Sequence, residues 1–484
     1  MCANLALQGF VVATYDPICQ GERRLWTDEQ LRDSLGDIPE DLFAVAMHMV
    51  PGNLFYLLDK NLMSLFVHDG HLVIDYICSR EDVDTERIGI TGQSGGGTQT
   101  AFLAVADDRI KAYSPIQCLS KQALMIPVSG IGDCEQSLLR ISSEEGFDYE
   151  DILWAALPNP VMVSNGSRDM FYIEGVRQFE SELSQVYKLL GMKDDFSVCV
   201  ADCTHHISAG TRLFAYRWFG KVFKNDDADV RERDIQIQTM AELACIPEGM
   251  LPGSPMVATK ELLIQEREKR VADPERIRAE LRDLLRVKNR RTTVESIVNG
   301  NALLHVLGAR TISFSDSGET AKSLCLLISD DRDLARTLEK QYRVIQAMPW
   351  EMGTAYSKNR NGYDAETRLF NAAAVLGDSL MADRVNQVLA LAEYLCESNG
   401  LDRLRLAGKG AGALVALLAA VVGKRFIKTA LVHCPRSLDA LFEDEHYVLA
   451  ETLILPGICG IADLEQLVSL EGDSMLMINP VDAR

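Results

Sequence analysis

Ser94 is the residue whose surroundings most directly suggest chemistry. It is the centre of Gly92-Gln93-Ser94-Gly95-Gly96, which matches the G-x-S-x-G pattern of a nucleophilic serine on a tight turn. An apolar strand-like run precedes it (87–92) and a helix-compatible run follows it (98–106). Two other interpretations are a structural glycine-rich turn and a phosphate-binding turn; no lysine follows as a P-loop requires, which disfavours the second.

A serine hydroxyl needs a histidine base, and the base needs a carboxylate to orient it. Asp169 ends the strand-like run VMVSNGSRD and fits the acid position. His205 and His206 follow the next apolar run, FSVCVADCTHHIS, and fit the base position. The alternatives are a helix-capping aspartate and ordinary loop histidines. The N–H of Gly95, directly after the serine, is one expected oxyanion donor.

The elements that would position these residues alternate between strand and helix. Residues 161–166 are expected to form a strand, residues 174–191 a helix, and residues 9–17 an apolar strand closed by Asp and Pro. Such alternation predicts the α/β class, with a mostly parallel sheet covered on both faces. Parallel strands place their carboxyl-end residues along one edge, where Ser94, Asp169 and one of the two histidines could meet.

The second half of the sequence repeats the first. YRVIQAMPW (342–350) resembles FVVATYDP (10–17), and EYLCESNGLDRLRLAGKGAGA (393–413) resembles DYICSREDVDTERIGITGQSGGG (75–97). We interpret this as a tandem duplication of one α/β unit. Copy two has a further strand-like run, SLCLLIS (323–329), before its FVVATYDP equivalent, whereas copy one is expected to lack that strand.

Three regions follow from this comparison. We expect an α/β domain over 1–223 that is incomplete at its N-terminus, a charged helical linker over 224–295, and a degenerate copy over 296–484. The turn at Gly92–Gly96 that carries Ser94 is called the elbow. At the corresponding position copy two reads Gly408-Lys409-Gly410-Ala411-Gly412, so Gly410 replaces the serine. Asp482 lies near its acid position, but no histidine follows. Copy two is therefore expected to be non-catalytic.

The composition is that of a globular protein with an excess of acidic residues. Apolar residues make up 47% of the chain and charged residues 25%, and the net charge is −21. This charge opposes binding to nucleic acid or to anionic membranes. The twelve cysteines contain no CxxC pair, and we expect reduced thiols rather than disulfides. We expect no metal and no cofactor, and a cytoplasmic location because no signal peptide or membrane span is recognisable.

Several runs together resemble the acetyl xylan esterase-like α/β-hydrolases, which are related to the dienelactone hydrolase and prolyl oligopeptidase branches. These runs are YDPICQGER (15–23), DVDTERIGITGQSGGGTQT (82–100), GDCEQ (132–136), SRDMFYIEG (167–175) and DCTHHIS with RLFAYRWF (202–219). The resemblance implies tandem α/β-hydrolase-like domains and a triad of Ser94, Asp169 and His205. It selects His205 because the spacing to RWF is kept, and leaves His206 as the alternative base.

The chain departs from the resembled pattern in two places. Before the strand at 10–17 the family has a strand ending in a His-Gly-like loop that supplies the second oxyanion donor, and that segment is missing here. Cys19 stands where the family tends to have glycine. The first departure leaves two facing strand edges, so we expect weak esterase activity and a tendency to aggregate.

The leading functional hypothesis is a serine hydrolase that cleaves a carboxylic ester through an acyl-enzyme intermediate. The resemblance implies an acetyl ester, so the expected partner is a small-molecule or carbohydrate ester. The alternatives are a non-catalytic binding module and a serine peptidase. The sequence indicates neither the oligomeric state nor the natural substrate.

Overall fold

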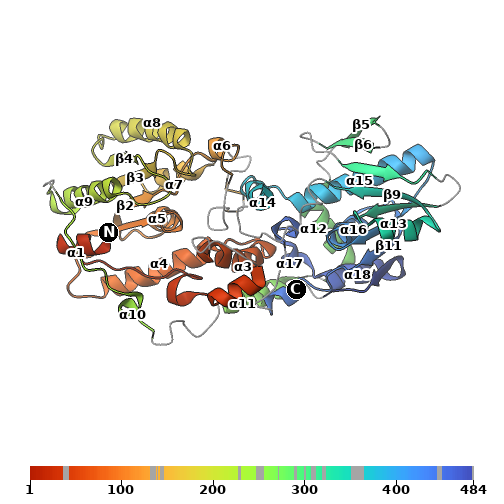
Figure 1. Ribbon diagram of the computed structural model, residues 1–484, viewed down its shortest axis with the longest axis horizontal. Coiled ribbons are helices and arrows are strands. Elements are labelled where there is room, and N and C mark those ends of the chain that lie inside the picture. Colours follow the sequence, from red (N-terminus) through yellow and green to blue (C-terminus); the bar gives the residue numbers. More distant parts are fainter. Residues whose placement is uncertain are drawn as a thin grey trace. The chain divides into compact units, whose positions relative to one another are not determined.

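The chain divides into two units of contacting residues, each built around its own parallel sheet (Figure 1). Unit 1 comprises residues 1–27, 61–254 and 374–377, and unit 2 comprises 28–60, 255–373 and 378–484. The structure, a computed structural model, describes residues 1–35, 43–130, 138, 140–141, 147–226, 230–246, 256–270, 272–287, 292–298, 301–306, 312–318, 323–349, 365–443 and 450–481. The run at 132–136 that contributed to the resemblance lies outside the described residues, as does Asp482.

The sheet of unit 1 is entirely parallel and has the order β1-β2-β3-β4. Its strands are β1 (Ile88–Gln93), β2 (Ile110–Ile116), β3 (Val161–Gly166) and β4 (Phe196–Ala201). The helices of this unit are α1 (Cys2–Leu7), α4 (Met63–Cys78), α5 (Gly95–Ala106), α6 (Gln122–Met125), α7 (Tyr149–Ala155), α8 (Ile173–Leu189), α9 (Ala209–Lys224) and α10 (Met240–Leu243), with a 3-10 turn at Gly21–Arg23.

Two apolar clusters hold these helices to opposite faces of the sheet. One cluster joins the buried side chains of α4, α5, α7 and α8 to Val161 and Val163 of β3. The other joins α1 and α9 to Met162, the residue between those two valines. Successive side chains of a strand point to opposite faces, so an uninterrupted apolar strand is buried on both sides. The α/β class with a parallel sheet is confirmed.

Unit 2 contains a six-stranded sheet with the order β12-β11-β10-β8-β9-β7, in which only β7 runs antiparallel to its neighbour. Its strands are β7 (Ser313–Asp316), β8 (Leu324–Ile328), β9 (Arg343–Met348), β10 (Leu404–Lys409), β11 (Phe426–Val432) and β12 (Met475–Ile478), and β5 (Thr292–Val298) with β6 (Asn301–Val306) form a separate hairpin. The helices grouped with it are α2 (Asp28–Leu35), α3 (Phe43–Leu57), α11 (Met256–Lys269), α12 (Pro274–Leu284), α13 (Arg332–Glu339), α14 (Ala365–Val375), α15 (Leu380–Asn399), α16 (Ala411–Val422), α17 (Ile458–Ile461) and α18 (Leu464–Glu471), with 3-10 turns at Asp439–Phe442, Glu451–Leu453 and Gly472–Ser474.

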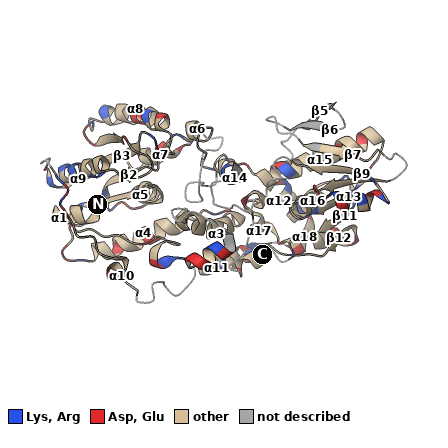
Figure 2. Cartoon of the chain, viewed as in Figure 1, with Lys and Arg blue, Asp and Glu red and all other residues tan. Residues whose placement is uncertain are grey.

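The two contact units cut the chain differently from the three expected regions. Residues 28–60 group with the second sheet, although they lie inside the expected first domain. The charged region expected as a linker contributes α10 to unit 1 and α11 and α12 to unit 2. Ile277 and Leu281 of α12 are buried. Helix α8 of unit 1 carries charges of both signs (Figure 2). Within the described residues, no helix is both long and apolar enough to cross a bilayer.

The two sheets share local geometry around the strand that precedes the elbow. Pairing between β1 and β2 shifts register between Ile88 and Gly89, and pairing between β10 and β11 shifts between Leu404 and Arg405, the aligned pair. Ser94 has φ 54° and ψ −121°, and Gly410 has φ 57° and ψ −123°. This agreement favours the inferred duplication, which stays an inference.

The strand expected over residues 9–17 is wrong, because residues 10–17 form no strand. In unit 2 the corresponding strand β9 pairs with β8, and β8 pairs in turn with β10. Among the described residues of unit 1, no strand pairs with β1 on the side away from β2. An extended segment without a neighbouring ladder cannot satisfy its backbone groups as a strand does. Phe10 and Val12 instead pack against the α1–α9 cluster.

The two sheets also differ at the aligned glycines that follow the β1–α5 and β10–α16 turns. A Cβ added to Gly412 would lie 1.9 Å from the carbonyl oxygen of Ile328, at the end of β8. A Cβ added to the aligned Gly96 would meet no atom within 4 Å. Strand β1 is therefore an edge strand in the described part of the chain, whereas β10 is central.

Candidate active site

The turn from β1 into α5 holds Ser94 in a strained conformation. Its φ of 54° lies in the left-handed region, which a side chain with a Cβ seldom adopts. A Cβ on Gly92 would lie 2.4 Å from the oxygen of Gly96, and one on Gly97 would lie 2.7 Å from the oxygen of Ile116. The backbone N–H of Ser94 donates to Ile116 O at 2.9 Å. Positions 92 and 97 thus admit only glycine, whereas Gly96, the second glycine of the sequence pattern, has room for a side chain.

Asp169 lies in the loop that follows β3. Its side chain is completely buried, and its Oδ1 accepts the backbone N–H of Phe171 at 3.1 Å. The same oxygen lies 3.0 Å from Nδ1 of His205. Its Oδ2 is buried and has no hydrogen-bond partner among the described residues. A buried carboxylate that contacts one ring nitrogen of a histidine is suited to orienting that imidazole.

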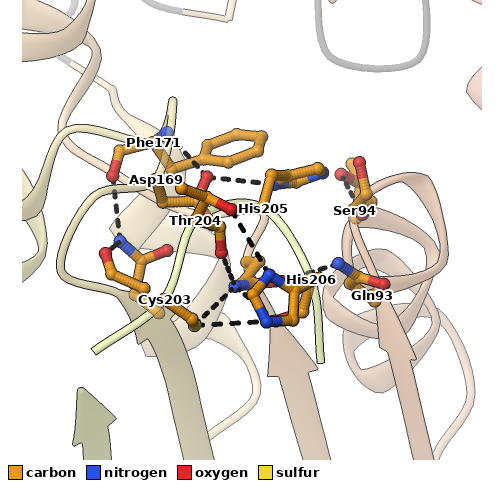
Figure 3. Close-up of polar contacts among 12 residues, drawn as sticks. Gln93, Ser94, Asp169, Phe171, Cys203, Thr204, His205 and His206 are labelled. Atoms are coloured by element: carbon orange, nitrogen blue, oxygen red, sulfur yellow. Dashed lines mark hydrogen bonds and ion pairs between the residues drawn. The ribbon is translucent and has the colours of Figure 1, made fainter. Parts of the chain in front are cut away.

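His205 lies after β4, and its ring faces Asp169 on one side (Figure 3). The side chain is 26% exposed, and the ring of Phe171 lies beside it with centroids 5.7 Å apart. His206 points elsewhere: its Nδ1 lies 3.3 Å from Oγ1 of Thr204, and the residue is exposed. Of the two histidines, it is therefore His205 that the structure brings to the acid.

His205 and Ser94 are not in hydrogen-bond contact. Figure 3 shows the His205 ring between Asp169 and Ser94, but no hydrogen bond joins this histidine to this serine. The line of three connected groups expected from the sequence is thus formed only in its acid–base half. In free enzymes such hydrogen bonds are often long, and they shorten when the substrate binds.

The N–H that was expected to donate to an oxyanion belongs to the first turn of α5. Gly95 is the first helical residue, and its N–H has no acceptor within the helix, as at every helix N-terminus. Gly95 is buried and follows Ser94 directly in the chain. The resemblance assigns a second donor to a loop after the strand that would lie beside β1, and the described residues contain no strand there.

The loop at Cys19 keeps the turn that a glycine would make. Cys19 is buried and has a φ of 68°, so it adopts the left-handed conformation itself. The loop is held to α4 because Arg23 pairs with Asp69 at 2.6 Å. Tyr15 in the same run donates its hydroxyl to Oε1 of Gln99 on α5 at 3.0 Å, and burial raises the pKa of Tyr15 to about 12.

Two thiols near the site are poor nucleophiles. Burial, aided by the charge of Asp169, raises the pKa of Cys118 well above its usual range. Burial also raises the pKa of Cys203, in the loop that carries His205. Both cysteines stay protonated near neutral pH, and a thiol attacks only as its thiolate. Neither thiol therefore competes with Ser94 as the candidate nucleophile.

Sequence reasoning missed Asn165, the buried residue that shapes the acid loop. Its Nδ2 donates to the carbonyl oxygens of Gly166 at 3.3 Å and Phe171 at 2.9 Å, the two ends of that loop. The only signal in the sequence was an asparagine at the end of an otherwise apolar strand. Unit 2 offers no equivalent machinery in its described residues: Gly410 has no side chain, and β12 ends at Ile478.

Comparisons with known proteins point towards hydrolases. No protein-family profile matches the chain. The protein named "Putative hydrolase YtaP" from Bacillus subtilis (strain 168) is 28% identical over 166 residues, which is 34% of this chain and 56% of that protein. The match therefore spans little more than half of the curated relative.

Among solved structures, methylesterase BT1017 is similar with a TM-score of 0.34 and 21% identity, over 46% of this chain and 54% of that one. A carbohydrate esterase family 15 glucuronoyl esterase from Caldicellulosiruptor kristjansonii is similar with a TM-score of 0.30 and 13% identity, over 45% of this chain and 65% of that one. These TM-scores are too low to establish a shared fold, so the α/β class rests on the sheet topology.

Proposed function

We propose that unit 1 is a serine hydrolase of the α/β-hydrolase type that cleaves a carboxylic ester through an acyl-enzyme intermediate. The observation that carries the proposal is the pairing of a left-handed Ser94 on a strand-to-helix turn with a buried Asp169–His205 contact at 3.0 Å. Serine, acid and histidine follow in that order at the ends of parallel strands, which is the arrangement such enzymes use.

In the proposed reaction Oγ of Ser94 attacks the acyl carbon, and Nε2 of His205 accepts the hydroxyl proton. The alcohol leaves with that proton. His205 then takes a proton from a water molecule, which attacks the acyl carbon, and returns that proton to Oγ of Ser94 as the acid leaves. Asp169 holds the Nδ1 proton of the ring throughout, and the N–H of Gly95 donates to the oxyanion.

The resemblance noted in the sequence favours an acetyl ester of a carbohydrate or of another small alcohol as the substrate. The similarity to a hydrolase is compatible with this class and does not select the acid or the alcohol. Hydrolysis of p-nitrophenyl acetate compared with a peptide amide separates an esterase from a serine peptidase.

Labelling with a fluorophosphonate probe tests the proposal directly. The oxygen of Ser94 displaces fluoride from phosphorus only when the hydroxyl is activated, so the unmodified chain should be labelled at Ser94 and the Ser94→Ala variant should not. His205→Ala should slow labelling strongly. A chain that folds but is never labelled would instead be a non-catalytic binding module, the alternative that the open Ser94–His205 step supports.

A further inference from the structure

Gln117 follows β2 directly and has an unusual environment for a glutamine. It is 1% exposed, and its φ of 50° places it in the left-handed region. Its backbone N–H donates to Ser164 O at 2.7 Å, so the residue continues the pairing of β2 with β3 beyond the strands. A large polar side chain held in a strained conformation inside the protein requires a reason beyond packing.

The side-chain amide of Gln117 joins the serine turn to the histidine loop. Its Oε1 accepts from Nε2 of Gln93, the residue before Ser94, at 2.6 Å. Its Nε2 donates to the carbonyl oxygens of Thr204 at 2.9 Å and His206 at 3.1 Å, the residues on either side of His205 in the chain. One buried amide thus contacts both segments that must meet for proton transfer.

Only a primary amide satisfies all these partners. Two carbonyl oxygens need two donors on one end of the side chain, and the Gln93 amide needs an acceptor on the other end. The reversed orientation would place an oxygen against two carbonyl oxygens. The histidine loop also crosses the end of β3, because a Cβ on Gly166 would lie 2.5 Å from Cys203 O. The loop therefore has little freedom to settle elsewhere.

We infer that Gln117 is a positioning residue for the proposed hydrolysis, setting the distance between His205 and Ser94 through the relay Gln93–Gln117–Thr204/His206. This inference rests on the proposed function. The Asp169 contact fixes the orientation of the His205 ring, whereas Gln117 ties the backbone that carries the ring to the serine turn.

Unit 2 has the same backbone without the relay. His433, which follows β11 as Gln117 follows β2, has φ 53° and donates its backbone N–H to Ile478 O at 3.0 Å. Lys409 takes the place of Gln93 and pairs with Asp331 instead. The left-handed residue thus belongs to the fold, while the glutamine pair occurs in the unit that has a serine and a histidine to align.

The test compares volume-conserving variants in the full chain. Gln117→Met removes the acceptor and both donors, Gln93→Met removes one donor from a less buried residue, and the double variant combines them. The matched control is Asn159→Leu, because Asn159 donates its side-chain N–H to Ile110 O at 3.1 Å at the opposite end of β2. Turnover of p-nitrophenyl acetate and amide hydrogen exchange at residues 203–206 are measured for each variant.

Gln117→Met should lower kcat about 10- to 100-fold, because small misplacements of a catalytic group cost this much, and should leave KM within about threefold. Exchange at 203–206 should accelerate, and Asn159→Leu should change neither quantity. Gln93→Met should show a smaller loss, and the double variant should lose no more than Gln117→Met, since both act on one link. If Gln117→Met does not fold, the same two measurements on Gln93→Met decide between the outcomes.

Unchanged kcat together with unchanged exchange in Gln117→Met would overturn the inference, as would a loss in the double variant equal to the product of the single losses. If the unmodified chain shows no turnover, the proposed function fails by itself. The positioning role in hydrolysis then fails with it, and exchange at 203–206 reports only whether Gln117 ties the histidine loop to the serine turn: faster exchange in Gln117→Met supports that tie, and unchanged exchange refutes it.

Discussion

The two adjacent histidines make the sharpest contrast at the scale of single residues. His205 touches the buried Asp169, whereas His206 contributes its carbonyl to Gln117 and exposes its ring. His205→Ala should lower kcat/KM for an ester by about 10³-fold or more, because the base is lost. His206→Ala should stay within about threefold, since its backbone carbonyl is kept. Equal losses in both variants would contradict the assignment.

Ser94 also carries a cost that can be measured. A residue with a Cβ at φ 54° and ψ −121° is strained by roughly 1–3 kcal/mol, and glycine is not. Ser94→Gly should therefore raise the free energy of unfolding of unit 1 by about 1 kcal/mol while abolishing activity. Ser94→Ala keeps the Cβ and serves as the control. Urea unfolding in which both variants match the unmodified chain would argue against stored strain.

At the scale of elements, the aligned glycines Gly96 and Gly412 predict opposite responses to alanine. Gly412→Ala brings a methyl group into Ile328 O and should destabilise unit 2 by about 1–3 kcal/mol or more. Gly96→Ala meets open space in a helix and should be neutral or stabilising by up to about 1 kcal/mol. Thermal melting of the two variants is the measurement. A large loss in Gly96→Ala would mean that the place beside β1 is filled.

The sequence predicted those elements whose pattern is local. The strand and turn at 87–97, the strand at 161–166 and the helix after it lie within a residue or two of the expected positions. Residues 10–17 have the same apolar pattern and form no strand, because strand formation depends on a neighbour that no local pattern reveals. Asp169 and the pair His205/His206 could be proposed from chain order, and the resemblance selected His205. Gln117 could not be proposed, because its role depends on three segments meeting in space.

At the scale of the whole molecule, the second unit repeats the elbow backbone without its chemistry. Gly410 has nearly the same φ and ψ as Ser94, yet the described residues of unit 2 hold no acid–base pair at this place. Gly410→Ser in a Ser94→Ala background should therefore show no ester hydrolysis above background. Turnover by that double variant would mean that unit 2 has a base after all.

The unpaired edge of β1 has a further consequence for the local unfolding of the two sheets in solution. Arg405 to Gly408 on β10 are paired on both sides, by β8 and β11, whereas β1 is paired by β2 alone among the described strands. Amide protons in a strand with one neighbouring strand exchange through smaller fluctuations than those in a strand with two neighbours. In native-state hydrogen exchange β1 should exchange well before β10, although their sequences and turns are alike. Unit 1 would then exchange as a separate, less protected cooperative unit, with the serine turn at its most labile edge.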